Sequence, residues 1–248
     1  MRVSYADFKN AVGRYFDLCE KEDVIITKNG KSVAKLVAHP EPLHSTVNEA
    51  QEGYKMNQRI SYEKYLSYAA SSEQRYELID GIVYLLASPS FRHQVLVREV
   101  TFILQHSLSD KGCQVISAPF DVRLHGYASK FEEDPNVVQP DVVVICDLEN
   151  ITEDGQYTGI PTLVVEVLSP STRDRDLVTK LNLYMRSGVN EYWVIDPIET
   201  LVWQYSFTNE RTLQRALVHS KDGQLVSSCF PGFTLNLNEL SLLNPLGK

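Results

Sequence analysis

The stretch PTLVVEVLSPSTRDRDLVTK, residues 161–180, decides the fold, because it joins an apolar strand to an amphipathic helix. Residues 162–167 are apolar on both faces, which is typical of a strand covered on both sides of a sheet. Glu166 interrupts this run, and a buried carboxylate without a partner costs on the order of several kcal/mol or gives up its charge. The sequence therefore predicts that another group balances Glu166.

A second acid, Asp141, stands directly before the apolar run 142–146, and a polar loop joins that run to the strand of Glu166. If the two strands pair antiparallel, both acids meet at one end of a buried sheet. Two close carboxylates repel each other unless one is protonated or a cation is bound. Because Mg²⁺ prefers oxygen ligands, the pair predicts a divalent metal site. The alternative is that both acids are strand-end residues in solvent.

A lysine follows on the helix that the pattern predicts over residues 173–187, which ends at Gly188. Leu177, Leu181 and Tyr184 form the inward stripe of this helix. Lys180 lies on the flank of the stripe. A lysine there either extends its charge outward to water or pairs with a carboxylate, and the spacing alone leaves both open.

The rest of the large domain alternates between strand and helix signals. The segment YELIDGIVYLL predicts a hairpin that turns at Asp80-Gly81. Ser61 and Ser90 are placed to cap two helices, and Phe102 is expected on the inner side of the second. Further strands are predicted within residues 113–124, 136–146, 191–207 and 215–230. The mixture of hairpins and helical crossovers predicts an α/β fold, with a central mixed sheet flanked by helices.

The N-terminal segment is organised differently. Apolar residues recur at helical spacing over residues 5–20, and two β-branched runs flank Asn29-Gly30, a strong hairpin signal. We therefore expect three parts: a helix–hairpin module over residues 1–40, a linker over residues 41–58, and the large domain over residues 59–248. The module is too small to bury much surface alone, so we expect it to dimerise or dock.

Composition limits the class of protein. The 248 residues are 43% hydrophobic and 23% charged, which is ordinary for a soluble globular chain. We expect a cytoplasmic protein without a membrane partner, because no apolar run approaches the ~18 residues of a membrane span and no signal peptide is evident. The four cysteines form no C-x-x-C pair, which argues against zinc and redox motifs and favours buried small hydrophobic residues.

The net charge of −8 is unevenly distributed. Residues 1–40 hold seven Lys/Arg against five Asp/Glu, and the remaining residues hold 17 against 27. An acidic body argues against purely electrostatic binding of nucleic acid, but it is compatible with a metal site, which needs carboxylates.

Pro140-Asp141 followed by Glu166-Val167-Leu168 resembles the signature of the PD-(D/E)XK nucleases. That signature has a lysine two residues after the second acid, where this chain has Leu168. In the superfamily the lysine can migrate to the following helix, and Lys180 is the residue that matches. The blocks RYELIDG, SFRHQVLV, QPDVVVICD and residues 161–197 together resemble the Uma-two family of restriction endonuclease-like proteins, over about residues 59–240.

This resemblance implies a restriction-endonuclease-like fold and a site built from five residues. Its implied catalytic residues are Glu77, His93, Asp141, Glu166 and Lys180. The implied metal is Mg²⁺ or Mn²⁺, with Asp141, Glu166 and His93 as ligands. Without the resemblance, Glu77 could be a solvent-facing strand residue and His93 a surface or capping residue. A helix N-terminus favours a neutral imidazole, which suits a proton acceptor or a metal ligand.

Residues 1–40 resemble antitoxins of the prevent-host-death type, and VIITKNGKSVAKLV matches the hairpin of that family. The resemblance implies a homodimer that binds an operator or a toxin. We therefore expect a metal-dependent DNA endonuclease fused to an antitoxin-like module. The alternative is a non-catalytic, antitoxin-like DNA-binding regulator in which an inactive nuclease fold serves as an interaction platform.

Overall fold

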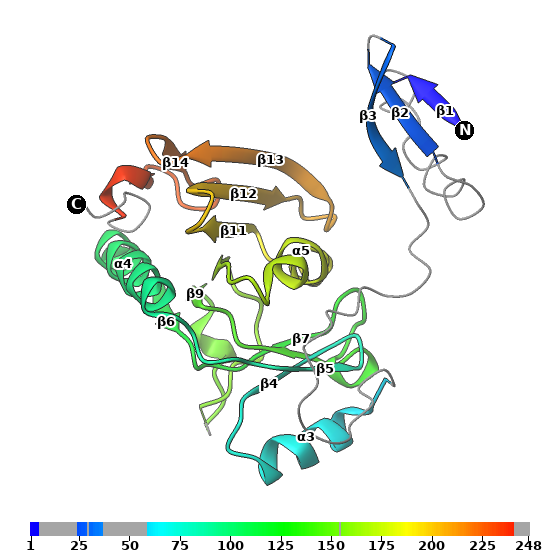
Figure 1. Cartoon of the computed structure of the whole chain (residues 1–248). Coiled ribbons are helices and arrows are strands. Elements are labelled where there is room, and N and C mark those ends of the chain that lie inside the picture. Colours follow the sequence, from blue (N-terminus) through cyan, green and yellow to red (C-terminus); the bar gives the residue numbers. More distant parts are fainter. Residues whose placement is uncertain (5–23, 29, 37–58, 154, 241–248) are drawn as a thin grey trace. The chain divides into compact units, whose positions relative to one another are not determined.

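The computed structural model describes residues 1–4, 24–28, 30–36, 59–153 and 155–240 (Figure 1). The chain divides into two compact units, Met1–Gly53 and Tyr54–Lys248. The helix predicted over residues 5–20 and the linker predicted over residues 41–58 lie outside the described residues.

The N-terminal unit contains a three-stranded sheet in the order β1-β2-β3. Strand β1 (Arg2–Ser4) is parallel to β2 (Val24–Lys28), which pairs antiparallel with β3 (Lys31–Leu36). The predicted hairpin is therefore confirmed, and Gly30 in its turn has φ of 78°. Strand β1 was not predicted, because three residues are too few to show an alternating pattern.

The C-terminal unit is built on a six-stranded sheet in the order β13-β12-β11-β10-β9-β6. Strands β10 and β11 are parallel, and every other neighbouring pair is antiparallel, which confirms the predicted central mixed sheet. The strands are β6 (Gln114–Ser117), β9 (Val142–Ile145), β10 (Leu163–Val167), β11 (Glu191–Asp196), β12 (Leu201–Phe207) and β13 (Leu213–Ser220).

Two smaller sheets complete this unit. An antiparallel sheet in the order β5-β4-β8-β7 consists of β4 (Tyr76–Ile79), β5 (Ile82–Leu85), β7 (Val122–Leu124) and β8 (Asn136–Val138). Strands β14 (Gln224–Val226) and β15 (Thr234–Asn236) form a third sheet. The predicted turn at Asp80-Gly81 is confirmed, since both residues have positive φ between β4 and β5.

The longer helices begin at the predicted caps. Helix α3 (Tyr62–Ser71) follows Ser61, and α4 (Phe91–Ser107) follows Ser90, whose Oγ accepts a hydrogen bond from the backbone N–H of His93. A π-helical segment (Arg175–Lys180) continues into α5 (Leu181–Ser187), which ends at Gly188 as predicted. Short 3-10 turns span Ser109–Lys111, Phe131–Glu133, Leu148–Asn150 and Leu237–Glu239. Among the helices that the structure describes, none is both long and apolar enough to cross a membrane.

One residue of α4 faces the opposite way from the prediction. Phe102 is 71% exposed, whereas Leu96, Val100 and Leu104 are fully or almost fully buried. At about 100° per residue, Phe102 lies about 120° around the helix from Leu96. Phe102 therefore falls outside the stripe of α4 that packs against the sheet, and the prediction was wrong.

Alternate residues of the six-stranded sheet enter two separate cores. Val142, Val144 and Val165 pack with the buried side of α4, whereas Val143 and Val164 pack with residues of α5 and of the four-stranded sheet. The sheet is therefore covered on both faces, which is why β9 and β10 are apolar throughout. This arrangement places α4 and α5 on opposite faces of the strands that carry the two acids.

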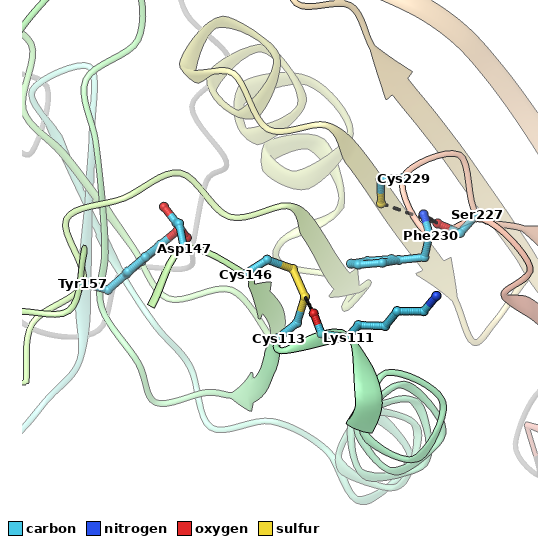
Figure 2. The surroundings of a disulfide bond; sticks show 8 residues. All are labelled: Lys111, Cys113, Cys146, Asp147, Tyr157, Ser227, Cys229 and Phe230. Atoms are coloured by element: carbon cyan, nitrogen blue, oxygen red, sulfur yellow. Dashed lines mark hydrogen bonds between the residues drawn. A yellow bond between two sulfur atoms is a disulfide. The ribbon is translucent and has the colours of Figure 1, made fainter. Parts of the chain in front are cut away.

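Two of the cysteines are joined by a disulfide, which corrects the expectation of buried hydrophobic thiols. Cys113 precedes β6 and Cys146 follows β9, next to the paired residues Gln114 and Ile145 (Figure 2). Cys146 is exposed, and Cys229 is a free thiol. A separation of 33 residues carries no recognisable signal, and only strand pairing brings the sulfurs together.

The division into units makes a prediction about truncation. We expect a fragment that starts at Arg59 to fold, because each described sheet is formed within one unit. Circular dichroism and a thermal melt should show a cooperative transition within a few degrees of that of the full chain. An insoluble or unfolded fragment beside a stable full chain would show that residues 1–58 belong to the same core.

Candidate active site

The two acids meet as the antiparallel arrangement of their strands requires. Val142 pairs with Val165 in the β9–β10 register, so Asp141 lies opposite Glu166. The backbone N–H of Val167 donates to Asp141 Oδ2 at 2.8 Å, and the backbone N–H of Asp141 approaches Glu166 Oε2 at 3.4 Å. Each carboxylate therefore accepts a hydrogen bond from the strand of the other. Glu166 is only 3% exposed, so the solvent alternative is wrong for this residue.

Lys180 reaches the acids from the last turn of the π-helical segment. Its Nζ lies 2.8 Å from Glu166 Oε1 and 2.8 Å from Glu77 Oε1. The side chain is 3% exposed, so the lysine pairs with carboxylates and does not extend into water. Burial disfavours its charge, but Glu166 and Glu77 outweigh burial and raise the pKa of Lys180.

Glu77 arrives from β4 in the other sheet and is fully buried. Besides Lys180, its Oε1 accepts a hydrogen bond from the backbone N–H of Gln139 at 2.9 Å. Its Oε2 is buried without a hydrogen-bond partner and lies 3.7 Å from Arg175 Nε. The solvent-facing alternative for Glu77 is therefore wrong.

His93 approaches from the first turn of α4. Its Nε2 lies 3.1 Å from Asp141 Oδ2, and the side chain is 11% exposed, so the surface alternative is wrong. Burial disfavours protonation, but the hydrogen bond and charge of Asp141 outweigh it and raise the pKa of His93. The direction of this shift is opposite to the one expected from the helix N-terminus.

The structure brings all five predicted side chains together and adds three others. The hydroxyl of Tyr184 donates to Glu166 Oε1 at 2.8 Å. Asp176 Oδ1 lies 3.8 Å from Lys180 Nζ and has no hydrogen-bond partner. Burial raises the pKa of Asp176 to about 6 against the opposing charge of Lys180. The four-residue spacing of Asp176 and Lys180 was the signal that could have identified this acid. Arg175, which lies beside Glu77, is the third added residue.

The cluster carries more negative than positive charge. Its acids are Glu77, Asp141, Glu166 and Asp176, and its permanent cations are Lys180 and Arg175. Burial raises the pKa of Glu166 well above its usual range; Lys180 opposes the shift, and the other three acids increase it. When all four acids are ionised and His93 is neutral, the cluster lacks two positive charges, which a divalent cation would supply.

The donor set fits a hard metal ion. Lys180 and Tyr184 occupy Glu166 Oε1, and Val167 and His93 occupy Asp141 Oδ2. Two oxygens remain as candidate ligand atoms: Asp141 Oδ1, and Glu166 Oε2, which has one long contact of 3.4 Å with the backbone N–H of Asp141. Within the described residues, no group of three or more His, Cys, Asp or Glu is arranged to hold a metal. Mg²⁺ is compatible with this set, since it often binds through one or two carboxylates and completes its shell with water and phosphate.

A mixed sheet with acids and a lysine at one end places the C-terminal unit among α/β proteins with a restriction-endonuclease-like fold. Residues 62–238 match the Uma2 family, described as "Putative restriction endonuclease", and the chain belongs to this family. Residues 1–42 match the family described as "Antitoxin Phd_YefM, type II toxin-antitoxin system".

Three proteins of known sequence or structure are similar to this chain. The uncharacterized protein slr1290 of Synechocystis sp. is 29% identical over 55% of this chain and 68% of its own length. The uncharacterized protein sll1609 of the same organism is 26% identical over 60% of this chain and 81% of its own length. A crystal structure titled as a putative nuclease belonging to DUF820, from Anabaena variabilis, superposes with a TM-score of 0.57 at 20% identity, over 74% of this chain and 99% of that one. This likeness supports the fold.

Proposed function

We propose that the chain is a metal-dependent endonuclease that hydrolyses phosphodiester bonds in DNA. The observation that carries the proposal is the pair formed by the half-buried Asp141 and the buried Glu166 at one end of the sheet, with Lys180 bonded to Glu166. Membership of the Uma2 family supports the reaction class. The excess of negative charge in the cluster supports a divalent cation, Mg²⁺ or Mn²⁺.

In this proposal Asp141 and Glu166 hold the metal, and His93 becomes a third ligand only when it is unprotonated and its Nε2 leaves Asp141 Oδ2, which lies 3.1 Å away. A bound metal polarises the phosphodiester and makes water a better nucleophile. Lys180 stabilises the charge that develops on the phosphate in the transition state. Glu77 holds the Lys180 ammonium in place, and Tyr184 holds the Glu166 carboxylate through a hydrogen bond at 2.8 Å.

The N-terminal module gives the proposal its second part. We propose that residues 1–40 form a homodimer and bind an operator or a toxin, as their match to an antitoxin family suggests. Seven Lys/Arg against five Asp/Glu in this segment are compatible with contact to DNA.

A non-catalytic regulator remains the second candidate. The acidic body of the chain favours it, because 27 acids against 17 Lys/Arg beyond residue 40 repel nucleic acid. In this case the nuclease-like unit would serve as an interaction platform for an antitoxin-like DNA-binding module.

A plasmid-cleavage assay separates the two candidates. We expect the full chain to nick or cut DNA with Mg²⁺ or Mn²⁺ and to be inactive in EDTA. Glu166→Gln should abolish cleavage, because it removes a metal ligand and the anionic partner of Lys180. Glu149→Gln, which changes an exposed acid on a 3-10 turn, is the matched control and should cleave normally. Cleavage that persists in EDTA would rule out the metal mechanism, and an inactive wild type would favour the regulator.

A further inference from the structure

Arg175 is a cation of the candidate active site whose role the proposed reaction does not explain. It opens the π-helical segment that ends with Lys180. Its guanidinium lies over the ring of Tyr84, 5.1 Å from the ring centroid. Tyr84 pairs with Glu77 in the β4–β5 register, so both side chains lie on the same face of that sheet. Arg175 is thus held against the face that carries Glu77.

The contacts of Arg175 leave hydrogen-bonding capacity unused. Its Nε is buried and has no hydrogen-bond partner. The nearby anion is Glu77 Oε2, and their separation of 3.7 Å is too long for a hydrogen bond. The side chain is only 12% exposed, so water compensates little. A buried donor without an acceptor is unfavourable, so an anion beside this guanidinium would meet a charge that protein and water leave incompletely satisfied.

The neighbouring cations are committed to protein partners. Lys180 Nζ bonds to Glu77 and Glu166 at 2.8 Å each. Arg173 donates a hydrogen bond through Nη1 to Asp196 and packs over the ring of Trp203. Of these three cations, Arg175 is the one without a hydrogen-bonded carboxylate in the described residues.

We propose that Arg175 binds a backbone phosphate of the nucleic acid next to the cluster of Asp141, Glu166 and Lys180. The inference rests on the proposed function, and it deepens that proposal by naming the residue that receives the polyanionic substrate in an acidic cleavage site. A guanidinium suits this task because it remains charged and its planar N–H groups match phosphate oxygens. Tyr84 orients the guanidinium, so little side-chain freedom is lost when the phosphate arrives.

The test is the salt dependence of DNA binding by the full chain. Anisotropy of a fluorescein-labelled duplex is measured with Ca²⁺ at several NaCl concentrations, and gel electrophoresis checks that the duplex stays intact. Arg175→Met should weaken binding for any DNA sequence. A plot of the logarithm of the association constant against the logarithm of the salt concentration should become less steep by about 0.9, the value for one lost phosphate contact. Because every variant is the full chain, residues 1–40 are identical in all of them, and a change in slope reports the substitution.

Two further variants sharpen the test. Arg175→Lys keeps the charge and should restore the slope while recovering only part of the affinity, because a lysine does not provide the planar fork. Arg173→Met, which removes a neighbouring arginine paired with Asp196, should leave the slope unchanged. Circular dichroism checks the fold, and Arg175→Gln replaces Arg175→Met if the latter does not fold.

The outcomes are distinguishable. A wild-type slope in Arg175→Met, or an equal loss in Arg173→Met, overturns the role of Arg175 while leaving the proposed nuclease intact. A wild-type chain that binds no DNA at low salt overturns the proposed function together with this inference.

Discussion

Lys180→Met is expected to lower the turnover of DNA cleavage by at least about 10²-fold, the usual scale for removing one transition-state stabiliser. Methionine keeps the length and apolar stem of the side chain and deletes only its charge. Affinity for Mn²⁺, measured by calorimetry, should change little or improve, because a competing positive charge has gone. The combination of lost turnover and retained metal distinguishes a lysine that acts on the reacting phosphate from one that maintains the metal site.

The same substitution should also affect folding. Lys180 Nζ bonds to Glu77 and Glu166 at 2.8 Å each, and neither acid is more than 3% exposed. Removing one partner of a buried ion pair costs about 3–5 kcal/mol, so metal-free Lys180→Met should unfold at a lower urea concentration than wild type. Added Mn²⁺ should recover part of this loss.

Lys64→Met is the control, since Lys64 is exposed on α3 and should give wild-type turnover and stability. Unchanged turnover in Lys180→Met would contradict the proposed role of the lysine. The buried contacts of Lys180 would then be purely structural, and Arg175 would be the next residue to test as the source of positive charge.

Glu191→Gln should cause the other large effect, a loss of about 3 kcal/mol or more in the free energy of unfolding. Glu191 is fully buried at the start of β11. Its oxygens accept hydrogen bonds at 2.6–3.2 Å from donors on β11, β12 and the loop after β14: Trp193 Nε1, Gln204 Nε2, Ser227 Oγ, Ser228 N and Cys229 N. A glutamine amide places N–H groups against some of these donors, so buried donors lose their acceptor.

The pH dependence gives this prediction a second measurement. Burial opposes the charge of Glu191, but the hydrogen bonds from Trp193, Ser227, Cys229 and Gln204 outweigh it and lower its pKa. A carboxyl whose pKa is lower in the folded state contributes stability above its unfolded pKa of about 4.3 and loses that contribution as pH falls through the folded value. Urea melts should therefore show a large gap between wild type and Glu191→Gln at pH 7 and a smaller gap below about pH 4.

Glu210→Gln, at an exposed position after β12, should match wild type at both pH values. Metal affinity should be unaffected by Glu191→Gln, because the β10–β11 register pairs Glu191 with Leu163 and leaves Glu166 opposite Val194. A gap that stays constant as the pH falls from 7 to well below 4 would show that the ionised form of Glu191 is not what stabilises the fold.

Much of the fold could be predicted from short-range patterns. The apolar run around Glu166 predicted a strand buried on both faces, and β10 is buried at every residue. Asp80-Gly81 and Asn29-Gly30 predicted two hairpins, and Ser61 and Ser90 predicted two helix starts. These features depend on backbone conformation and on periodicity within a few residues, so the chain displays them locally.

Short-range sequence patterns predicted only part of the candidate site. The five predicted residues come from separate segments, and the resemblance to a nuclease family was needed to connect them. Asp176 was missed although its four-residue spacing from Lys180 was a local signal. Arg175 was missed because nothing local shows that it faces Glu77, roughly a hundred residues earlier. The disulfide between Cys113 and Cys146 was missed for the same reason, since it depends on the pairing of β6 with β9.

The two hairpin turns, the helix starts at Ser61 and Ser90 and the presence of an acid in a buried strand were therefore determined by the amino-acid sequence itself, because each follows from the chemistry of neighbouring residues. The partners and charge states of the acids were decided only by tertiary structure. Lys180 could have extended into water, and packing instead enclosed it between Glu77 and Glu166. The position of His93 at a helix N-terminus could have favoured a neutral ring, and the contact with Asp141 instead raised the pKa of His93. Burial and the distance between charges set both results, and these quantities exist only once remote segments have packed together.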